Sequence, residues 1–174
     1  YFIEKGHEVT VACERSSEGP VMDTYKGANL VYFPFQPPKR YSLRKIYEGF
    51  NDLYFYFKLA RQTDVMYILA GLGTQVLPLL RIINPRLRIV TNNDGLEWKR
   101  SKYNIIERIL WKSFIRSSMR FSHLVVHDNP RLADFFPRIN HKNTISIPYG
   151  VEKQEEKNWD MELLIDKINH FPPI

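Results

Sequence analysis

The chain has 174 residues, of which 44% are hydrophobic, so it can form one folded domain with a core and is not a disordered segment. Its formal net charge of +6 favours anionic partners such as phosphates, nucleic acid or a membrane surface, and selects none of them. The single cysteine, Cys13, excludes an internal disulfide framework and a cysteine-rich zinc site, and it favours a reducing, cytoplasmic setting.

The first third of the chain predicts a helix end, two strands and one long helix. Residues 1–6 have the pattern of a last helical turn closed by a glycine, and residues 7–14 alternate as a strand does. Residues 28–35 predict a second strand. Residues 42–62 have helical spacing of apolar groups, with Ser42 expected as the N-cap.

The rest of the chain alternates strands with helices. Strands are predicted over residues 64–69, 87–92, 122–127 and 143–150. Helices are predicted after Gly73 up to Asn84, over residues 101–120, and over a short stretch that begins at residue 129. This alternation predicts a doubly wound α/β fold, with a mainly parallel, Rossmann-like sheet and helices on both faces.

The composition changes after Val151, where the chain becomes charged and ends with two prolines. We therefore expect one α/β domain over residues 1–151, and a linker or the beginning of a further domain over residues 152–174. No stretch approaches the roughly 18 apolar residues that a membrane-spanning helix needs.

The candidate site follows the strand predicted at 87–92. In a parallel α/β sheet, ligands bind at the carboxyl ends of the strands, and residues 92–100 (NNDGLEWKR) come directly after a buried strand. Asp94 and Glu97 can divide acid and base roles, or one can orient a sugar hydroxyl while the other pairs with a cation. In the alternative interpretation, Asp94 caps the turn at Gly95 and Glu97 is a solvated partner of the cations.

Trp98 in the same segment can stack on a sugar ring or anchor the loop to the core. Gly71 and Gly73 precede a helix, where backbone N–H groups can meet a phosphate, although a tight turn explains them equally well. His127 ends another strand, and either Asp128 or Asn129 can be the N-cap of the helix that follows.

Two stretches combine cations with aromatic residues, one around residues 37–57 and one over residues 99–120. The second predicts an amphipathic helix that faces phosphates or lies on an anionic membrane, or one that is simply solvated. No nucleic-acid-binding motif accompanies the charge, so no nucleic acid is expected. No histidine has partners at metal-ligand spacing, so no metal is expected. The buried stripe of this helix is predicted to comprise Ile105, Ile106, Ile109, Leu110, Phe114 and Ile115.

Five motifs in this order resemble those of a known family of bacterial sugar transferases. They are GHEVTV (6–11), DVMYILAGLG (64–73), NNDGLEWKRSKY (92–103), HDNP (127–130) and SIPYGVE (146–152). The chain is similar over about residues 1–152 to the N-terminal domain of family 4 glycosyltransferases, in particular the DUF1972 group. That group includes rhamnosyltransferases of capsule and O-antigen assembly, and the DGLEWKR block is its most specific element here.

The resemblance implies one half of a two-domain GT-B fold. Its N-terminal domain binds a saccharide or lipid-linked saccharide acceptor, and its C-terminal domain binds the nucleotide-sugar donor. Such enzymes retain anomeric configuration, need no metal, and work in the cytoplasm or at the inner face of the cell membrane. The family's first strand with its Gly-rich turn, and its donor domain, have no counterpart in these residues, so the chain alone is expected to be inactive.

The resemblance also assigns roles to particular residues. Asp94 and Glu97 are the expected catalytic residues, with Asp94 at the position of an acceptor-side His or Asp. Contact with the acceptor or with the interdomain cleft is expected from Gly71, Gly73, Asn93, Gly95, Trp98, Lys99, Arg100, His127, Asn129, Tyr149 and Gly150. The alternative to the enzyme is a non-catalytic α/β module that binds a membrane or an anionic ligand through its basic face.

Overall fold

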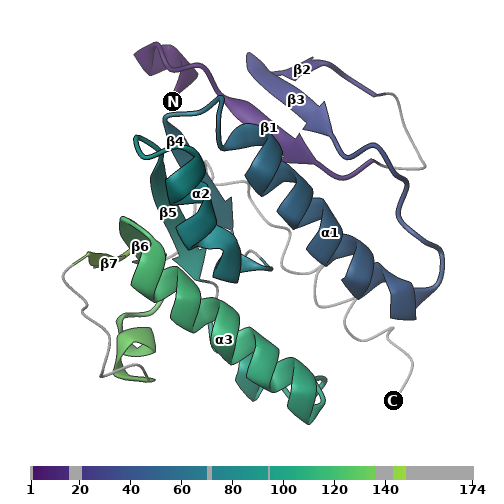
Figure 1. The fold of residues 1–174 in the computed structure, drawn as a ribbon, viewed down its shortest axis with the longest axis vertical. Coiled ribbons are helices and arrows are strands. Elements are labelled where there is room, and N and C mark those ends of the chain that lie inside the picture. Colours follow the sequence, from purple (N-terminus) through teal and green to yellow (C-terminus); the bar gives the residue numbers. More distant parts are fainter. Residues whose placement is uncertain (1, 16–20, 70–71, 94, 136–142, 148–174) are drawn as a thin grey trace, which may run out of the picture.

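The computed structural model describes residues 2–15, 21–69, 72–93, 95–135 and 143–147 (Figure 1). Over these residues the chain forms seven strands, three α-helices and four 3₁₀-helices. In chain order they are η1 (Ile3–Lys5), β1 (Thr10–Cys13), β2 (Thr24–Tyr25), β3 (Ala28–Tyr32), α1 (Tyr41–Leu59), β4 (Val65–Leu69), η2 (Thr74–Val76), α2 (Leu77–Ile83), β5 (Arg88–Asn93), η3 (Glu97–Lys99), α3 (Ile105–Phe121), β6 (Leu124–His127), η4 (Pro130–Phe135) and β7 (Thr144–Ser146).

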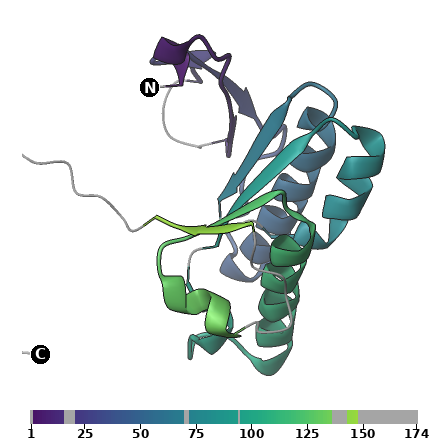
Figure 2. The ribbon, with the colours of Figure 1, turned by 90° about the vertical axis from the view of Figure 1, so that its left-hand side faces the viewer.

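The strands form two sheets. The larger sheet has the order β4-β5-β6-β7 and all its pairs are parallel, as connections through helices require. The smaller sheet has the order β1-β3-β2, in which β1 and β3 are parallel and β2 is antiparallel. Helices α1, α2 and α3 cover one side of the strands and η4 lies on the other side (Figure 2). The predicted Rossmann-like α/β fold is confirmed.

Helix α1 connects the two sheets and packs on both. Tyr56 and Ala60 belong to the main core with β4, β5 and α2, while Tyr47 and Phe55 join Phe33 in a second cluster beside β3. The main core contains side chains with no exposed surface. They are Ala60, Leu77, Leu80, Leu87 and Ile89.

The short strand β2 was not predicted from the sequence. It is exposed and contains only two residues, so it has no apolar alternation to reveal it. The turn to β3 consists of Lys26 (φ 48°) and Gly27 (φ 83°), and two successive residues with positive φ are typical of a tight two-residue hairpin.

Both long helices begin at other residues than predicted. The N-cap prediction for Ser42 is wrong, because α1 begins at Tyr41 and the extended residue Arg40 precedes it without a side-chain cap. Helix α3 begins at Ile105, later than predicted, because a capping box fixes its start. The backbone N–H of Glu107 donates to Asn104 Oδ1 (2.9 Å), and the N–H of Asn104 donates to Glu107 Oε2 (2.9 Å).

The predicted buried stripe of α3 is largely wrong. Ile115 is buried, but Ile105 is 75% exposed and Ile109 is 65% exposed, and Ile106 and Leu110 are exposed as well. The inner face of α3 is partly polar, since Ser117 Oγ donates to the backbone oxygen of Thr74 at 2.8 Å. Helical spacing alone did not distinguish the two apolar faces, and hydrogen bonds to η2 determine which one turns inward.

None of the helices in the described ranges is both long enough and apolar enough to cross a membrane.

Two isoleucines of α3 provide a direct test of this orientation. Ile115→Ala should lower the free energy of unfolding by about 2–4 kcal/mol, because it leaves a cavity beside Met119 and Val125. Ile109→Ala should change it by less than about 0.5 kcal/mol, because its side chain already contacts water. Urea unfolding of both variants measures the difference. Equal losses would contradict the orientation.

Candidate functional site

The carboxyl ends of β5 and β6 bring two buried polar residues together. Asn93 and His127 are paired in register as the last residues of these parallel strands, and they are 6% and 2% exposed. Ser118 Oγ of α3 lies 2.9 Å from Asn93 Oδ1 and 2.8 Å from the backbone oxygen of Ile115, so its hydroxyl links the Asn93 amide to α3. Within the described ranges, Asn93 Nδ2 has no hydrogen-bond partner.

The loop after β5 turns at Gly95 (φ 75°) and brings Glu97 inward. Glu97 is only 8% exposed, and its carboxylate has two protein partners. Arg100 pairs with Oε1 at 2.7 Å and the Tyr103 hydroxyl donates to Oε2 at 3.2 Å. The expected pairing of an acid with the neighbouring cations is therefore present, but the acid is buried and holds the loop in shape.

Trp98 faces the core from the same loop. It is half-buried and packs against the cluster of Ile115, Met119 and Val125, and its ring meets Phe135 edge-on at 6.4 Å. The Lys99 ammonium lies over the Phe135 ring, 4.0 Å from its centroid. Of the two roles considered for Trp98, the geometry favours the anchor of the loop.

Tyr103 connects this loop to α1. The centroid of its ring lies 5.4 Å from the Lys45 ammonium and 4.9 Å from the Lys102 ammonium. Lys45 also forms an ion pair with Glu107, the same carboxylate that caps α3. These contacts lower the pKa of Glu107, with the hydrogen bond from Lys45 as the main cause. One set of charged contacts therefore ties the site loop to the starts of both long helices.

The loop after β4 is organised by a residue that the sequence did not reveal as part of a site. The backbone N–H of Leu72 donates to Asp52 Oδ2 of α1 at 2.9 Å. Gly73 adopts φ 72°, which favours glycine, and a Cβ there would lie 3.0 Å from the Leu53 side chain, which would have to shift. The geometry of Gly73 is that of a tight turn held by α1.

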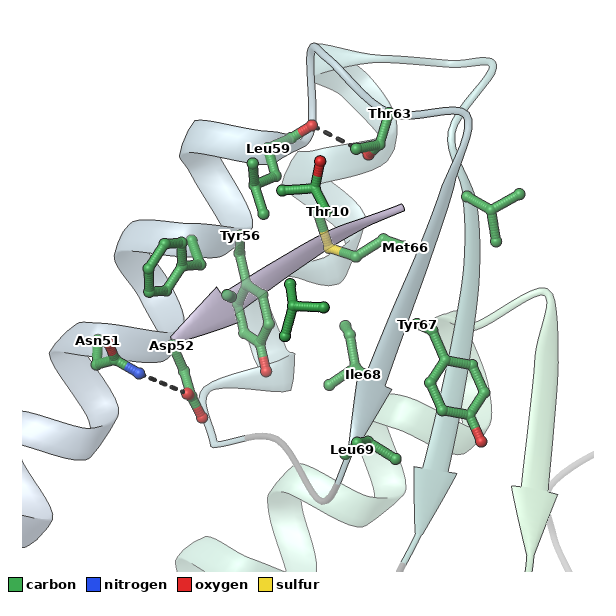
Figure 3. Close-up of a pocket in the computed structure, with 14 residues that line it drawn as sticks. Thr10, Asn51, Asp52, Tyr56, Leu59, Thr63, Met66, Tyr67, Ile68 and Leu69 are labelled. Atoms are coloured by element: carbon green, nitrogen blue, oxygen red, sulfur yellow. Dashed lines mark hydrogen bonds between the residues drawn. The ribbon is translucent and has the colours of Figure 1, made fainter. Parts of the chain in front are cut away.

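Asp52 and Tyr56 line a pocket between β1, α1 and β4 (Figure 3). The pocket has a volume of about 280 Å³ and separates the smaller sheet from the larger one. Burial raises the pKa of Asp52 to about 6, although the hydrogen bond from Leu72 favours the charged form. Burial also raises the pKa of Tyr56, whose hydroxyl has no hydrogen-bond partner within the described part of the chain.

Apart from Gly73, the predicted site residues fall into two groups within the described ranges, and four others lie outside them. Asn129 is the N-cap of η4, since its Oδ1 accepts the N–H of Arg131 at 3.0 Å, and His127 lies two residues before it at the sheet edge. Asn93 ends β5, and Gly95, Glu97 and Trp98 follow it in the same loop, with the exposed Lys99 and Arg100. Asp94, Gly71, Tyr149 and Gly150 lie outside the described residues.

Among the residues that the structure describes, no group of three or more His, Cys, Asp or Glu side chains is arranged to hold a metal ion. His123 lies at the amino end of β6, where its Nδ1 accepts the N–H of Ile89 at 3.0 Å. Burial lowers its pKa, and so do the nearby cations Arg81 and Arg88. The opposite, carboxyl edge presents the buried polar side chains of Asn93 and His127.

Comparison with known proteins identifies the family of this chain. Residues 3–152 match the family described as a domain of unknown function, DUF1972, which covers most of the chain. No curated protein sequence matches the chain.

The raised pKa of Asp52 predicts a pH-dependent contribution to stability. The folded state favours the protonated acid, so the contribution is complete below about pH 4 and is lost as the pH rises through about 6. Asp52→Asn removes the buried charge and keeps an acceptor for Leu72. Urea unfolding at pH 4 and at pH 7.5 measures the free energy of unfolding of both proteins. The advantage of Asp52→Asn over the unchanged chain should be about 2 kcal/mol larger at pH 7.5 than at pH 4.

Asp52→Ala is the matched comparison. It removes the charge and the acceptor together, so it should be less stable than Asp52→Asn by about 1 kcal/mol at both pH values. A stability difference between the Asn variant and the unchanged chain that is the same at both pH values would contradict the raised pKa.

Proposed function

The chain belongs to the DUF1972 family, and on this basis, together with its carboxyl-edge site, we propose that it is the acceptor-binding part of a retaining glycosyltransferase. The proposed substrate is a saccharide or a lipid-linked saccharide of the bacterial cell surface. The sugar, rhamnose or another hexose, comes from a nucleotide-sugar. The resemblance of the DGLEWKR block to that group of transferases supports the choice of reaction.

The observation that carries the proposal is the pair of buried polar residues at the sheet edge. Asn93 and His127 are neighbours across β5 and β6, and Asp94 follows Asn93 in the sequence. The carboxyl edge of a parallel sheet is where α/β proteins bind small ligands. Such sites combine a shaped surface with a few fixed hydrogen-bonding groups, which is what a sugar with many hydroxyls requires.

The role of Asp94 rests on the resemblance, and the roles of Glu97 and Trp98 rest on their contacts. In this proposal the Asp94 carboxylate orients the acceptor hydroxyl and takes its proton. The hydroxyl oxygen bonds to the anomeric carbon of the donor on the face from which the nucleotide diphosphate leaves, so configuration is retained. The bond from that carbon to the nucleotide diphosphate breaks in the same reaction. Glu97 is a positioning residue, because Arg100 and Tyr103 occupy its two oxygens. Trp98 attaches the loop to the core beneath α3.

The donor site belongs, in this proposal, to a second domain outside these 174 residues. The 174-residue chain alone should therefore bind acceptor without transferring sugar. The first measurement is the coding sequence on both sides of the 174 codons. Roughly 150–200 further residues of a second α/β domain would support the transferase. An isolated gene of this length would instead favour the non-catalytic binding module.

A transfer assay tests the chemistry. The complete gene product should move labelled sugar from at least one nucleotide-hexose to lipid-linked saccharides extracted from the cells that encode it. Asp94→Asn should lower the rate by about 100-fold or more, as expected when a positioned carboxylate is lost. Asp64→Asn is the matched control, since this exposed carboxylate lies at the amino end of β4, at the opposite edge of the sheet.

Glu97→Gln separates positioning from chemistry. It keeps a side chain that can accept from Tyr103 but weakens the pair with Arg100, so the rate should fall by less than in Asp94→Asn. An unchanged transfer rate in Asp94→Asn would contradict the role proposed for Asp94. No transfer by the complete gene product from any nucleotide-sugar tried would contradict the proposed transferase function.

A further inference from the structure

The buried carboxylate of Glu97 has one partner inside its loop and one outside it. Oε1 pairs with Arg100, three residues further along the same loop, at 2.7 Å. Oε2 accepts a hydrogen bond at 3.2 Å from the hydroxyl of Tyr103, which lies one residue before the N-cap of α3. A carboxylate that is 8% exposed needs such partners, because a buried charge without them is strongly unfavourable. The Tyr103 hydroxyl therefore helps to determine where Glu97 lies.

The Tyr103 side chain is held in turn by a residue of another helix. The ammonium of Lys45 in α1 lies over its ring, 5.4 Å from the centroid, and the same ammonium pairs with Glu107 of α3. On the side of α3, the Trp111 ring lies 5.8 Å from the Tyr103 ring. A cation is attracted to the face of an aromatic ring, so Lys45 holds Tyr103 in a defined place relative to α1.

The start of α3 is held without Lys45. Its capping box closes between Asn104 and Glu107 through two hydrogen bonds of 2.9 Å, both within the first turn. The loop backbone is tied to α3 as well, since Arg108 Nε donates to the backbone oxygen of Tyr103 at 2.9 Å. What Lys45 adds is a contact between the loop and α1.

The contact with α1 matters because the core fixes the place of α1. Tyr56 of this helix packs in the main core with β4, β5 and α2. A contact from α1 to the Tyr103 ring therefore relates the position of Glu97 to the sheet. Glu97 belongs to the loop that contains Asp94, and Trp98 anchors the same loop to the core beneath α3. The loop is thus held from both long helices.

We propose that Lys45 is a positioning residue for the carboxyl-edge site, which acts through the ring and hydroxyl of Tyr103 on Glu97 and so on the loop that contains Asp94. The inference rests on the proposed function, because the loop enters the reaction through Asp94. Lys45 acts without touching the acceptor, since its ammonium is engaged by Glu107 and Tyr103. A misplacement of about 1 Å can lower a rate by about 100-fold, so such a residue has a measurable effect.

Amide hydrogen exchange of the 174-residue chain tests the contact with the loop. In Lys45→Met, the amides of Lys99 and Arg100, which donate within the η3 turn, should exchange about tenfold faster. The amide of Ser122 at the end of α3 should keep its exchange rate. The thermal midpoint should fall by no more than about 4 °C, because a partly exposed ion pair contributes little to stability. Lys45→Arg keeps a cation for the same contacts and should restore slow exchange.

The transfer assay with the complete gene product tests the consequence for the reaction. Lys45→Met should lower kcat by about tenfold and change KM for the acceptor by less than about twofold, because the contacts of the acceptor itself remain. Tyr103→Phe keeps the ring beneath Lys45 and removes the hydroxyl that Glu97 accepts, so it should lower kcat to a similar extent. The double variant should lose no more than the more impaired single variant, since both substitutions interrupt the same series of contacts. Lys45→Arg should restore most of kcat.

Lys58→Met is the matched control. Lys58 is an exposed lysine of the same helix, and its ammonium lies 5.2 Å from the centroid of the Tyr54 ring and donates to the Tyr54 hydroxyl at 3.0 Å. This contact stays within α1. Its loss should therefore change neither the exchange of the loop amides nor kcat.

Unchanged exchange at Lys99 and Arg100 in Lys45→Met would overturn the inference, whatever the transfer rates are. A raised KM for the acceptor in Lys45→Met that Tyr103→Phe does not reproduce would overturn it too, because Lys45 would then contact the acceptor directly. No transfer by the unchanged gene product, together with faster loop exchange in Lys45→Met, would contradict the proposed function and support the contact between Lys45 and the loop.

Discussion

The packing of α1 on both sheets is the contact on which the rest of the structure depends. The two sheets share no strand pairing within the described residues, and α1 contributes side chains to the cores on either side of the gap. The same helix carries Asp52, which holds the loop after β4, and Lys45, which reaches the start of α3. The position of the site loop relative to the smaller sheet is therefore set by one helix and its contacts.

Much of this fold follows from local patterns in the sequence. Strands β4, β5 and β6 lie within one or two residues of the predicted ranges, because β-branched residues and flanking turns mark them clearly. The orientation of α3 does not follow from such patterns. Apolar residues occupy both of its faces, and the choice between them depends on Ser117 and Ser118, whose hydroxyls bond to groups far away in the sequence. Periodicity carries no information about such partners.

The candidate site divides in the same way. Its place at the end of β5 and the residues Asn93, Glu97 and His127 are visible in the sequence, because they end a strand or lie in the loop that follows one. The supporting residues are not, since Tyr103, Lys45 and Ser118 act across long sequence separations. The position of Asp52 could have been noticed in the sequence, because it lies on the same helical face as the apolar Tyr56 and Leu59. Burying a carboxylate without a specific partner is unfavourable, so such a position indicates that a hydrogen-bond donor is nearby.

The gap between the sheets also has a consequence for the backbone of β4. Arg88 N–H donates to the oxygen of Asp64, so in the parallel pairing the amides of Met66 and Ile68 point to β5. The amides of Val65, Tyr67 and Leu69 then point to the pocket, across which β1 lies without pairing to β4. Alternate residues of a single strand should thus differ in their protection from exchange with solvent deuterium. That alternation would disappear whenever an extended segment occupied the gap.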